Sequence, residues 1–388
     1  MDAHNTSMNS PKRILVIKFR HIGDVLLTAP LISTLKLGIP GSRICAVVKP
    51  GTEAMLEGHP ELDALYVVPM RRNGESAIGF FLRTLKFLSQ LRRERFDLAI
   101  NTTEGDRGIL LSWLIGAKAR WGIVKEGREK AWQARLLTRQ FRPLQGYVHT
   151  VIRNLSLAAP LGLKECREIK LFVSEADRAH VRELLDKQGG VPSHTLIHCH
   201  PTSRWMFKCW PADRVSETID WLQGQGYRVA LTCAPDAGER VFLDSIVKAC
   251  KTSPVDLGGQ LSLKQTAALS GMSRLFFGVD SAPMHMAAAM NTPTLGIFGP
   301  SGTFDWGPWP NGWMGDGTPY PGWNGIKKAL QHRVVQDDRE CAPCGRDGCL
   351  NTKRSLCLDE LPAEKVKGAV MGMLGVDSVA TRISMHLQ

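Results

Sequence analysis

The sequence predicts an α/β protein of two doubly wound domains, each a parallel sheet covered by helices. First, a chain of 388 residues is long enough for two domains of roughly 150 residues each. Second, short apolar runs alternate with helical stretches in both halves, a pattern typical of parallel sheets. Third, residues 173–192 hold one polar helix between Gly and Pro breaks, which marks a boundary between the halves.

The elements of each half follow from this alternation. In the first half, the run RILVIK at residues 13–18 is of the buried-strand type. We expect the elements of this half to be strands at 13–18, 44–48 and 97–101 and helices at 25–37 and 80–93. In the second half we expect strands at 195–198, 228–232, 274–277 and 294–298 and helices at 212–223, 239–249 and 263–270.

The end of the chain differs from the rest. Residues 299–325 are rich in Gly, Pro and Trp, so they are neither a long helix nor a regular strand, and a loop of this length is typically functional. A last helix is expected at residues 362–374. We therefore expect domains at residues 1–175 and 176–360, followed by a helix and tail at 361–388.

Composition excludes several classes of protein. With 43% hydrophobic residues the chain is neither disordered, nor collagen-like, nor a polytopic membrane protein. The apolar stretch after Arg13 is interrupted by Lys18, Arg20 and His21, so it is not a signal peptide. We therefore expect a cytoplasmic protein, in which the ten Cys form no structural disulfides.

The positive charge is confined to the first half. The first 170 residues hold 27 Lys and Arg against 15 Asp and Glu, whereas the remaining residues hold 22 of each. This excess either only aids solubility or indicates a polyanionic partner: nucleic acid, an anionic membrane or a phosphorylated substrate. Few aromatic residues accompany the basic clusters, which argues against nucleic acid. The basic clusters lie at residues 71–72, 92–95 and 120–130.

Two junctions between a strand and a helix carry the chemistry. In the first, Lys18, Arg20, His21 and Asp24 follow the strand at 13–18. Asp24 is either a helix N-cap or a functional carboxylate, and four ionisable groups in seven residues exceed what a cap needs.

The second junction is GVDSAPMH at residues 278–285, where small residues open a helix. Backbone N–H groups at Ser281 and Ala282 could bind an anion such as a diphosphate, although Pro283 lacks an N–H. Asp280 could cap the helix or bind sugar hydroxyls, and His285 could donate to a phosphate or be structural.

A loop at residues 200–211 adds polar groups to the second half. Thr202 and Ser203 offer hydroxyl groups, and Arg204 and Lys208 bring positive charge to the same strand end. Because the glycine-rich nucleotide motifs G-x-G-x-x-G and G-x-x-x-x-G-K-[ST] are absent from the sequence, these junctions are the candidate site.

Taken together, these segments resemble the heptosyltransferases of bacterial lipopolysaccharide synthesis, which form glycosyltransferase family 9. The segments that carry the resemblance are RILVIKFRHIGDVLLTAP, HPTSRWMFKCWP, LTCAPDAGER, GVDSAPMHMAAA and GIFGPS. The K-x-R-x-x-G-D, F-K-C-W and D-S-A-P strings resemble the heptosyltransferase III subgroup most.

The resemblance implies a GT-B fold, with two Rossmann-like domains facing a central cleft, the acceptor on the first and a nucleotide sugar on the second. It implies inverting transfer from ADP-L-glycero-β-D-manno-heptose to the phosphorylated inner core of lipopolysaccharide, at the cytoplasmic face of the inner membrane. Asp24 would be the catalytic base and Lys208 would face the diphosphate, without a metal ion. The resemblance also implies contacts to the sugar donor from Thr202, Ser203, Glu239, Asp280, Ser281, Ala282 and His285, and the basic half would supply contacts to the acceptor from Lys18, Arg20, His21, Arg71, Arg72 and Arg120.

Two alternatives stay open at this point: another GT-B enzyme acting on a nucleotide sugar, such as a non-heptose transferase or an epimerase, and a nucleic-acid-binding protein. A cysteine cluster lies outside the heptosyltransferase hypothesis, whereas a nucleic-acid-binding protein would use it together with the basic face. Cys341, Cys344, Cys349 and Cys357 have a spacing compatible with structural zinc, although reduced or partly paired thiols are the alternative that we favour.

Overall fold

The computed structural model describes residues 11–124, 127 and 130–375, which form two compact units. The N-terminal unit comprises residues 11–146 and 150–172 of this range, and the C-terminal unit comprises 147–149 and 173–375. The chain therefore passes between the units after Phe172, where the sequence predicted a boundary after residue 175. The helix expected near the end of the chain belongs to the C-terminal unit, and the expected tail at 376–388 lies outside the described residues.

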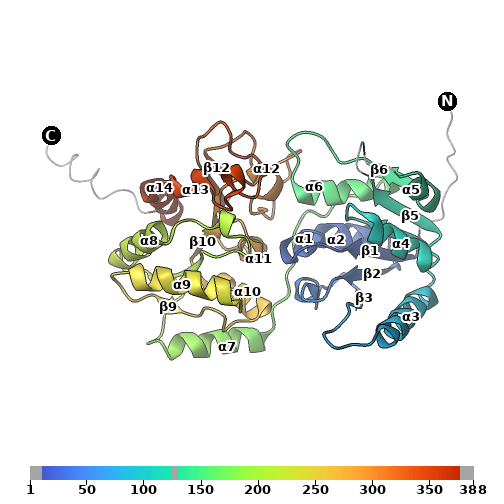
Figure 1. Cartoon of the computed structure of the whole chain (residues 1–388), viewed down its shortest axis with the longest axis horizontal. Coiled ribbons are helices and arrows are strands. Elements are labelled where there is room, and N and C mark those ends of the chain that lie inside the picture. Colours follow the sequence, from blue (N-terminus) through green and yellow to red (C-terminus); the bar gives the residue numbers. More distant parts are fainter. Residues whose placement is uncertain (1–10, 125–126, 128–129, 376–388) are drawn as a thin grey trace. The chain divides into compact units, whose positions relative to one another are not determined.

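The N-terminal unit is a parallel sheet of six strands in the order β3-β2-β1-β4-β5-β6. Helices α3 and α4 pack on one face of this sheet, and α2 and α6 lie together in the unit (Figure 1). The strands are β1 (Arg13–Lys18), β2 (Arg43–Val48), β3 (Ala64–Val67), β4 (Leu98–Asn101), β5 (Ala119–Ile123) and β6 (Arg139–Phe141). The helices are α1 (Ile22–Leu26), α2 (Ala29–Gly38), α3 (Ala77–Arg93), α4 (Asp106–Leu114), α5 (Ala131–Leu136) and α6 (Thr150–Leu155).

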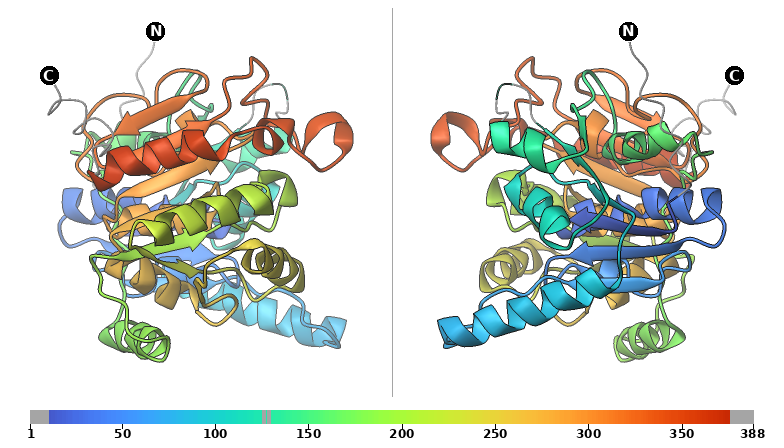
Figure 2. Two further views of the ribbon diagram at one scale, coloured as in Figure 1. Left: turned by 90° about the vertical axis from the view of Figure 1, so that its left-hand side faces the viewer. Right: turned by 90° about the vertical axis from the view of Figure 1, so that its right-hand side faces the viewer.

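The C-terminal unit has a sheet of seven strands in the order β12-β13-β11-β10-β7-β8-β9, in which only the β12–β13 pair is antiparallel. Its strands are β7 (Leu196–His200), β8 (Arg228–Leu231), β9 (Val255–Asp256), β10 (Leu275–Val279), β11 (Thr294–Phe298), β12 (Ile326–Ala329) and β13 (His332–Gln336). Its helices are α7 (Glu175–Asp186), α8 (Ala212–Gly224), α9 (Ala237–Ala249), α10 (Leu263–Met272), α11 (Ala282–Ala289), α12 (Thr303–Trp306), α13 (Leu356–Asp359) and α14 (Ala363–Leu374). Helices α8, α9 and α14 share one apolar core with the strands, and α11 packs into a second one (Figure 2).

The prediction of an α/β protein with two doubly wound domains is therefore confirmed. The predicted helix at 25–37 is wrong in one respect, because α1 ends at Leu26 and α2 begins at Ala29. Pro30 lies in the first turn of α2, where it has no N–H to continue the hydrogen bonding of a preceding turn. The sequence analysis also missed the four edge strands β3, β6, β9 and β12 and the interior strands β5 and β13.

Candidate active site

In the C-terminal unit, the ends of β7 and β10 bring Lys208 and Asp280 together. These strands are neighbours where the strand order reverses, the place at which doubly wound sheets bind ligands. Lys208 Nζ donates a hydrogen bond of 2.6 Å to Asp280 Oδ2, although the two residues are 72 positions apart. The side chain of Asp280 is 7% exposed and that of Lys208 is 24% exposed, so the ammonium group is the more accessible partner.

The carboxyl group of Asp280 is held in its charged form. Burial alone would raise its pKa, but the charge and hydrogen bond of Lys208 outweigh burial, with help from the Ser301 hydroxyl and from His285. The net effect is a pKa below the ordinary value of 3.8, so Asp280 is a carboxylate at neutral pH. Ser301 was not among the predicted site residues, although it ends the GIFGPS segment that carries the resemblance and follows the buried strand β11.

The amino end of α11 lies beside this ion pair. Ser281 is the N-cap residue, Ala282 is the first helical residue, and Pro283 follows. Asp280 precedes the cap, so the alternative in which Asp280 caps the helix is wrong. The Ser281 hydroxyl is buried and makes no hydrogen bond within the described part of the chain. Free N–H groups, the helix dipole and the Lys208 ammonium together form a site suited to a diphosphate.

Thr202 and Glu239 support this site through a contact with each other. Thr202 Oγ1 donates to Glu239 Oε2 at 2.6 Å, and the Ala234 N–H donates to the same oxygen at 3.1 Å. Both side chains are buried, and their contact joins the loop that follows β7 to the first turn of α9. Ser203 accepts a hydrogen bond from the Trp205 N–H at 3.3 Å. The predicted contacts of these residues with a sugar donor stay predictions.

A buried network behind Thr202 was missed by the sequence analysis. The Thr232 hydroxyl lies 2.7 Å from His198 Nε2 and 2.8 Å from His200 Nδ1. Burial lowers the pKa of His200 to about 3, so its imidazole is neutral. The Thr232 hydroxyl can donate to one ring nitrogen and accept from the other, so the tautomers of the two rings are coupled. The available signal was the His198–Cys199–His200 alternation, which places both rings on one side of a buried strand.

In the N-terminal unit, Asp24 lies at the end of β1 next to β4, where that sheet also reverses its strand order. His21 is the N-cap of α1 and Asp24 is the third residue of this helix, so the alternative in which Asp24 is the N-cap is wrong. Asp24 Oδ1 is 4.0 Å from both Lys18 Nζ and Arg20 Nε. The structure thus brings a carboxylate and two cations together, as the sequence predicted.

Lys18 is buried beneath Asp24, and its Nζ donates to the Thr102 carbonyl oxygen at 3.2 Å. Burial lowers the pKa of the Lys18 ammonium from 10.5 to about 8, while the charge of Asp24 opposes this change. Lys18 is therefore a cation whose charge can be lost under mildly alkaline conditions.

This pKa predicts a measurable pH dependence of stability. Between about pH 8 and pH 10.5 the folded protein binds fewer protons at Lys18 than the unfolded chain does, so stability rises with pH in that range. We expect the free energy of unfolding of the wild type to rise relative to that of Lys18→Met by up to about 3 kcal/mol between pH 7.5 and pH 10. Urea denaturation of both proteins at several pH values measures this, and a difference that does not change with pH would contradict the assignment.

The other residues predicted to contact an acceptor lie elsewhere in the N-terminal unit. Arg71 and Arg72 are exposed on the segment before α3, and the Arg120 guanidinium donates to the carbonyl oxygens of Leu136 and Ala117. Within the described part of the chain, no hydrogen bond or ion pair joins any of the three to Asp24. Lys125 and Arg128, two cations of the predicted cluster at 120–130, lie outside the described residues.

The four C-terminal cysteines, for which the sequence left zinc ligation and unligated thiols open, differ in exposure. Cys341 and Cys344 are exposed, whereas Cys357 is buried. Burial and the nearby Cys349, Cys344 and Cys341 raise the pKa of the Cys357 thiol to about 12. Within residues 11–124, 127 and 130–375, no three His, Cys, Asp or Glu side chains are placed to hold a metal ion.

The sequence and the fold of the chain are both similar to those of known heptosyltransferases. The chain is 35% identical over 292 residues to lipopolysaccharide heptosyltransferase 3 of Escherichia coli K12. This alignment covers 75% of this chain and 83% of that protein. The fold matches the solved glycosyltransferase family 9 protein of Veillonella parvula with a TM-score of 0.74 and 22% identity, over 94% of this chain and 98% of the other. It also matches E. coli ADP-heptose lps heptosyltransferase II with a TM-score of 0.69 and 19% identity, over 93% and 98% of the two chains.

These matches confirm the predicted fold class, that of the GT-B glycosyltransferases. The model of the family "Glycosyltransferase family 9 (heptosyltransferase)" matches residues 84–315, and the chain belongs to this family of glycosyltransferases.

Proposed function

We propose that the protein transfers heptose from ADP-L-glycero-β-D-manno-heptose to the phosphorylated inner core of lipopolysaccharide, with inversion at the anomeric carbon. The observation that carries this proposal is the Lys208–Asp280 pair at the amino end of α11, a site suited to a diphosphate. The similarity to lipopolysaccharide heptosyltransferase 3 supports heptose and the lipopolysaccharide core as the transferred sugar and the acceptor.

The chemistry divides between the two sites. Asp24 accepts the proton of the acceptor hydroxyl as its oxygen attacks the anomeric carbon, and the bond from that carbon to the ADP oxygen breaks. Lys208 and the amino end of α11 stabilise the negative charge that develops on the departing ADP. A single displacement of this kind, through an oxocarbenium-like transition state, inverts the configuration.

The charge of the N-terminal half supports the proposed acceptor and the proposed location of the enzyme. The basic N-terminal half suits the phosphates of the inner core and of an anionic membrane. In the described part of the chain, no helix has both the length and the apolar character required to cross a bilayer. We propose that the enzyme works in the cytoplasm as a peripheral protein of the inner membrane.

Mass measurement of the products tests the proposed function. Incubation with ADP-heptose and a panel of core-truncated lipopolysaccharides should add one heptose to one truncation, and this also identifies the acceptor sugar. UDP-glucose serves as the control sugar nucleotide. Transfer of a different sugar, or epimerisation of the sugar nucleotide without transfer, would favour the alternative that the chain is another GT-B enzyme.

We also propose that transfer needs no metal ion, because Lys208 and the α11 dipole supply the positive charge that faces the diphosphate. Activity should therefore stay unchanged after dialysis against EDTA. A loss of activity that Mg²⁺ restores would contradict this mechanism.

A further inference from the structure

The outer face of α3 is apolar. Ile78, Phe81, Leu82 and Leu85 follow a helical spacing on one side of α3 and are 45–73% exposed. The opposite side of the helix buries Phe87 and Leu91 against the sheet. A surface helix of a globular protein normally turns polar residues outward, so a second apolar face on the solvent side needs a partner.

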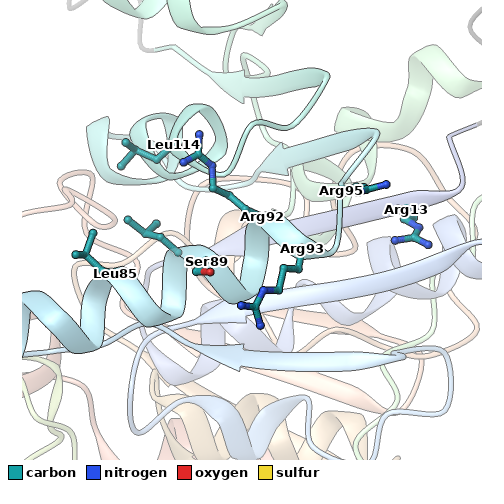
Figure 3. Close-up of a pocket in the computed structure, with 8 residues that line it drawn as sticks. Arg13, Leu85, Ser89, Arg92, Arg93, Arg95 and Leu114 are labelled. Atoms are coloured by element: carbon teal, nitrogen blue, oxygen red, sulfur yellow. The ribbon is translucent and has the colours of Figure 1, made fainter.

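Helix α4 extends this apolar surface. Leu110, Trp113 and Leu114 are 40–50% exposed and lie at i, i+3 and i+4 positions, on one side of α4. Leu114 lines a groove together with Leu85 of α3, so the two apolar stripes adjoin (Figure 3). We call this surface, formed by the exposed apolar residues of both helices, the α3–α4 face.

Arginines border the α3–α4 face. Arg13, Arg92, Arg93 and Arg95 line the same groove as Leu85 and Leu114 (Figure 3). Among the described residues, Arg92, Arg93 and Arg95 have no carboxylate within ion-pair distance. The nearest carboxylate in the sequence, Glu94, is engaged by Arg43 and by the Tyr66 hydroxyl. The basic charge at this end of α3 is therefore available to an external anion.

We propose that the α3–α4 face docks on the surface of an anionic lipid bilayer. The exposed apolar side chains enter the boundary between head groups and acyl chains, Trp113 lies at the head-group level, and the arginines bind lipid phosphates. The apolar side chains are complementary to the acyl chains of an anionic bilayer, and the arginines beside them are complementary to its phosphates. This inference rests on the proposed function in one respect, that the acceptor is lipid-linked and the enzyme works at a membrane.

Vesicle co-sedimentation of the full chain tests the proposal with two variants. Phe81→Ser/Leu82→Ser should weaken partition onto phosphatidylglycerol vesicles by about tenfold, because two apolar side chains no longer enter the bilayer. Arg92→Gln/Arg93→Gln should weaken it by roughly fivefold per arginine, with no effect on phosphatidylcholine vesicles. The matched controls are Val241→Ser, an exposed apolar residue of α9, and Arg182→Gln/Lys187→Gln on α7, which should bind as the wild type does.

Further measurements separate the possible failures. Thermal melting shows whether each variant is folded, and transfer to a deacylated, soluble core acceptor should stay within twofold of the wild type. Wild-type binding that both variants retain in full would overturn the assignment of this face. A wild type that binds no anionic vesicles would overturn membrane docking while leaving heptose transfer to the soluble acceptor intact. A change of oligomeric state in the variants, without a change in vesicle binding, would make the face a protein interface and would also overturn the proposal.

Discussion

Asp24→Asn should lower kcat by roughly 10²- to 10⁴-fold, the range that a general base contributes. The substitution keeps the shape of the side chain but removes the carboxylate that accepts the hydroxyl proton. Asp24 lies 4.0 Å from Lys18 and Arg20, so its carboxylate is held in place by two cations rather than by a helix cap. Steady-state kinetics with a saturating acceptor measure the loss.

Binding of the sugar donor separates a catalytic defect from a folding defect in this variant. The dissociation constant of ADP-heptose, measured by calorimetry, should stay within about threefold of the wild type, because the diphosphate site lies on the C-terminal unit. Asp106→Asn is the matched control: Asp106 is also in the first turn of a helix of the N-terminal unit and pairs with Lys130. An Asp24→Asn enzyme that keeps more than a tenth of the wild-type kcat would place the base elsewhere.

Lys208→Ala should weaken ADP binding by roughly 10- to 100-fold and lower kcat as well. A hydrogen bond to a charged group contributes about 1.5–3 kcal/mol, and the ammonium of Lys208 supplies both positive charge and a hydrogen-bond donor to the diphosphate. The variant should also lose about 2–3 kcal/mol of stability, because the Asp280 carboxylate is left buried without its cation. Calorimetry and thermal melting measure the two effects.

Adenosine is the probe that distinguishes ligand binding from a structural role. It lacks the diphosphate, so its affinity should be the same in Lys208→Ala and in the wild type. An equal loss of affinity for ADP and adenosine would mean that Lys208 only supports the fold. Lys365→Ala, which breaks the Lys365–Asp338 pair in the same unit, is the matched control and should bind ADP normally.

Much of the site could be predicted because it lies where strands end. The carboxyl end of a parallel strand is visible in sequence as an apolar run followed by small and polar residues, so Asp24, Lys208 and Asp280 were all identified. Whether Asp24 and Asp280 cap their helices could not be predicted in this way. His21 and Ser281 occupy the N-cap positions, which is a matter of backbone dihedral angles and not of residue type.

The contacts between residues far apart in the chain could not be predicted from the sequence. Thr202 meets Glu239 and His200 shares Thr232 with His198 only because β7 and β8 are neighbours in the sheet. The apolar outer face of α3 was missed for a related reason. The periodicity of its sequence shows two apolar sides, but only the packed structure shows which side covers the sheet.

By itself, the sequence determined the α/β class, the two-domain organisation, the uneven distribution of charge and the residue types at the strand ends. These properties depend on local patterns, which act within a few residues along the chain. The tertiary structure alone decided which side chains are paired, which are buried and which apolar face is left to solvent. Those outcomes depend on strand order and helix packing, which join residues far apart in the chain and fix the dielectric environment of each charge.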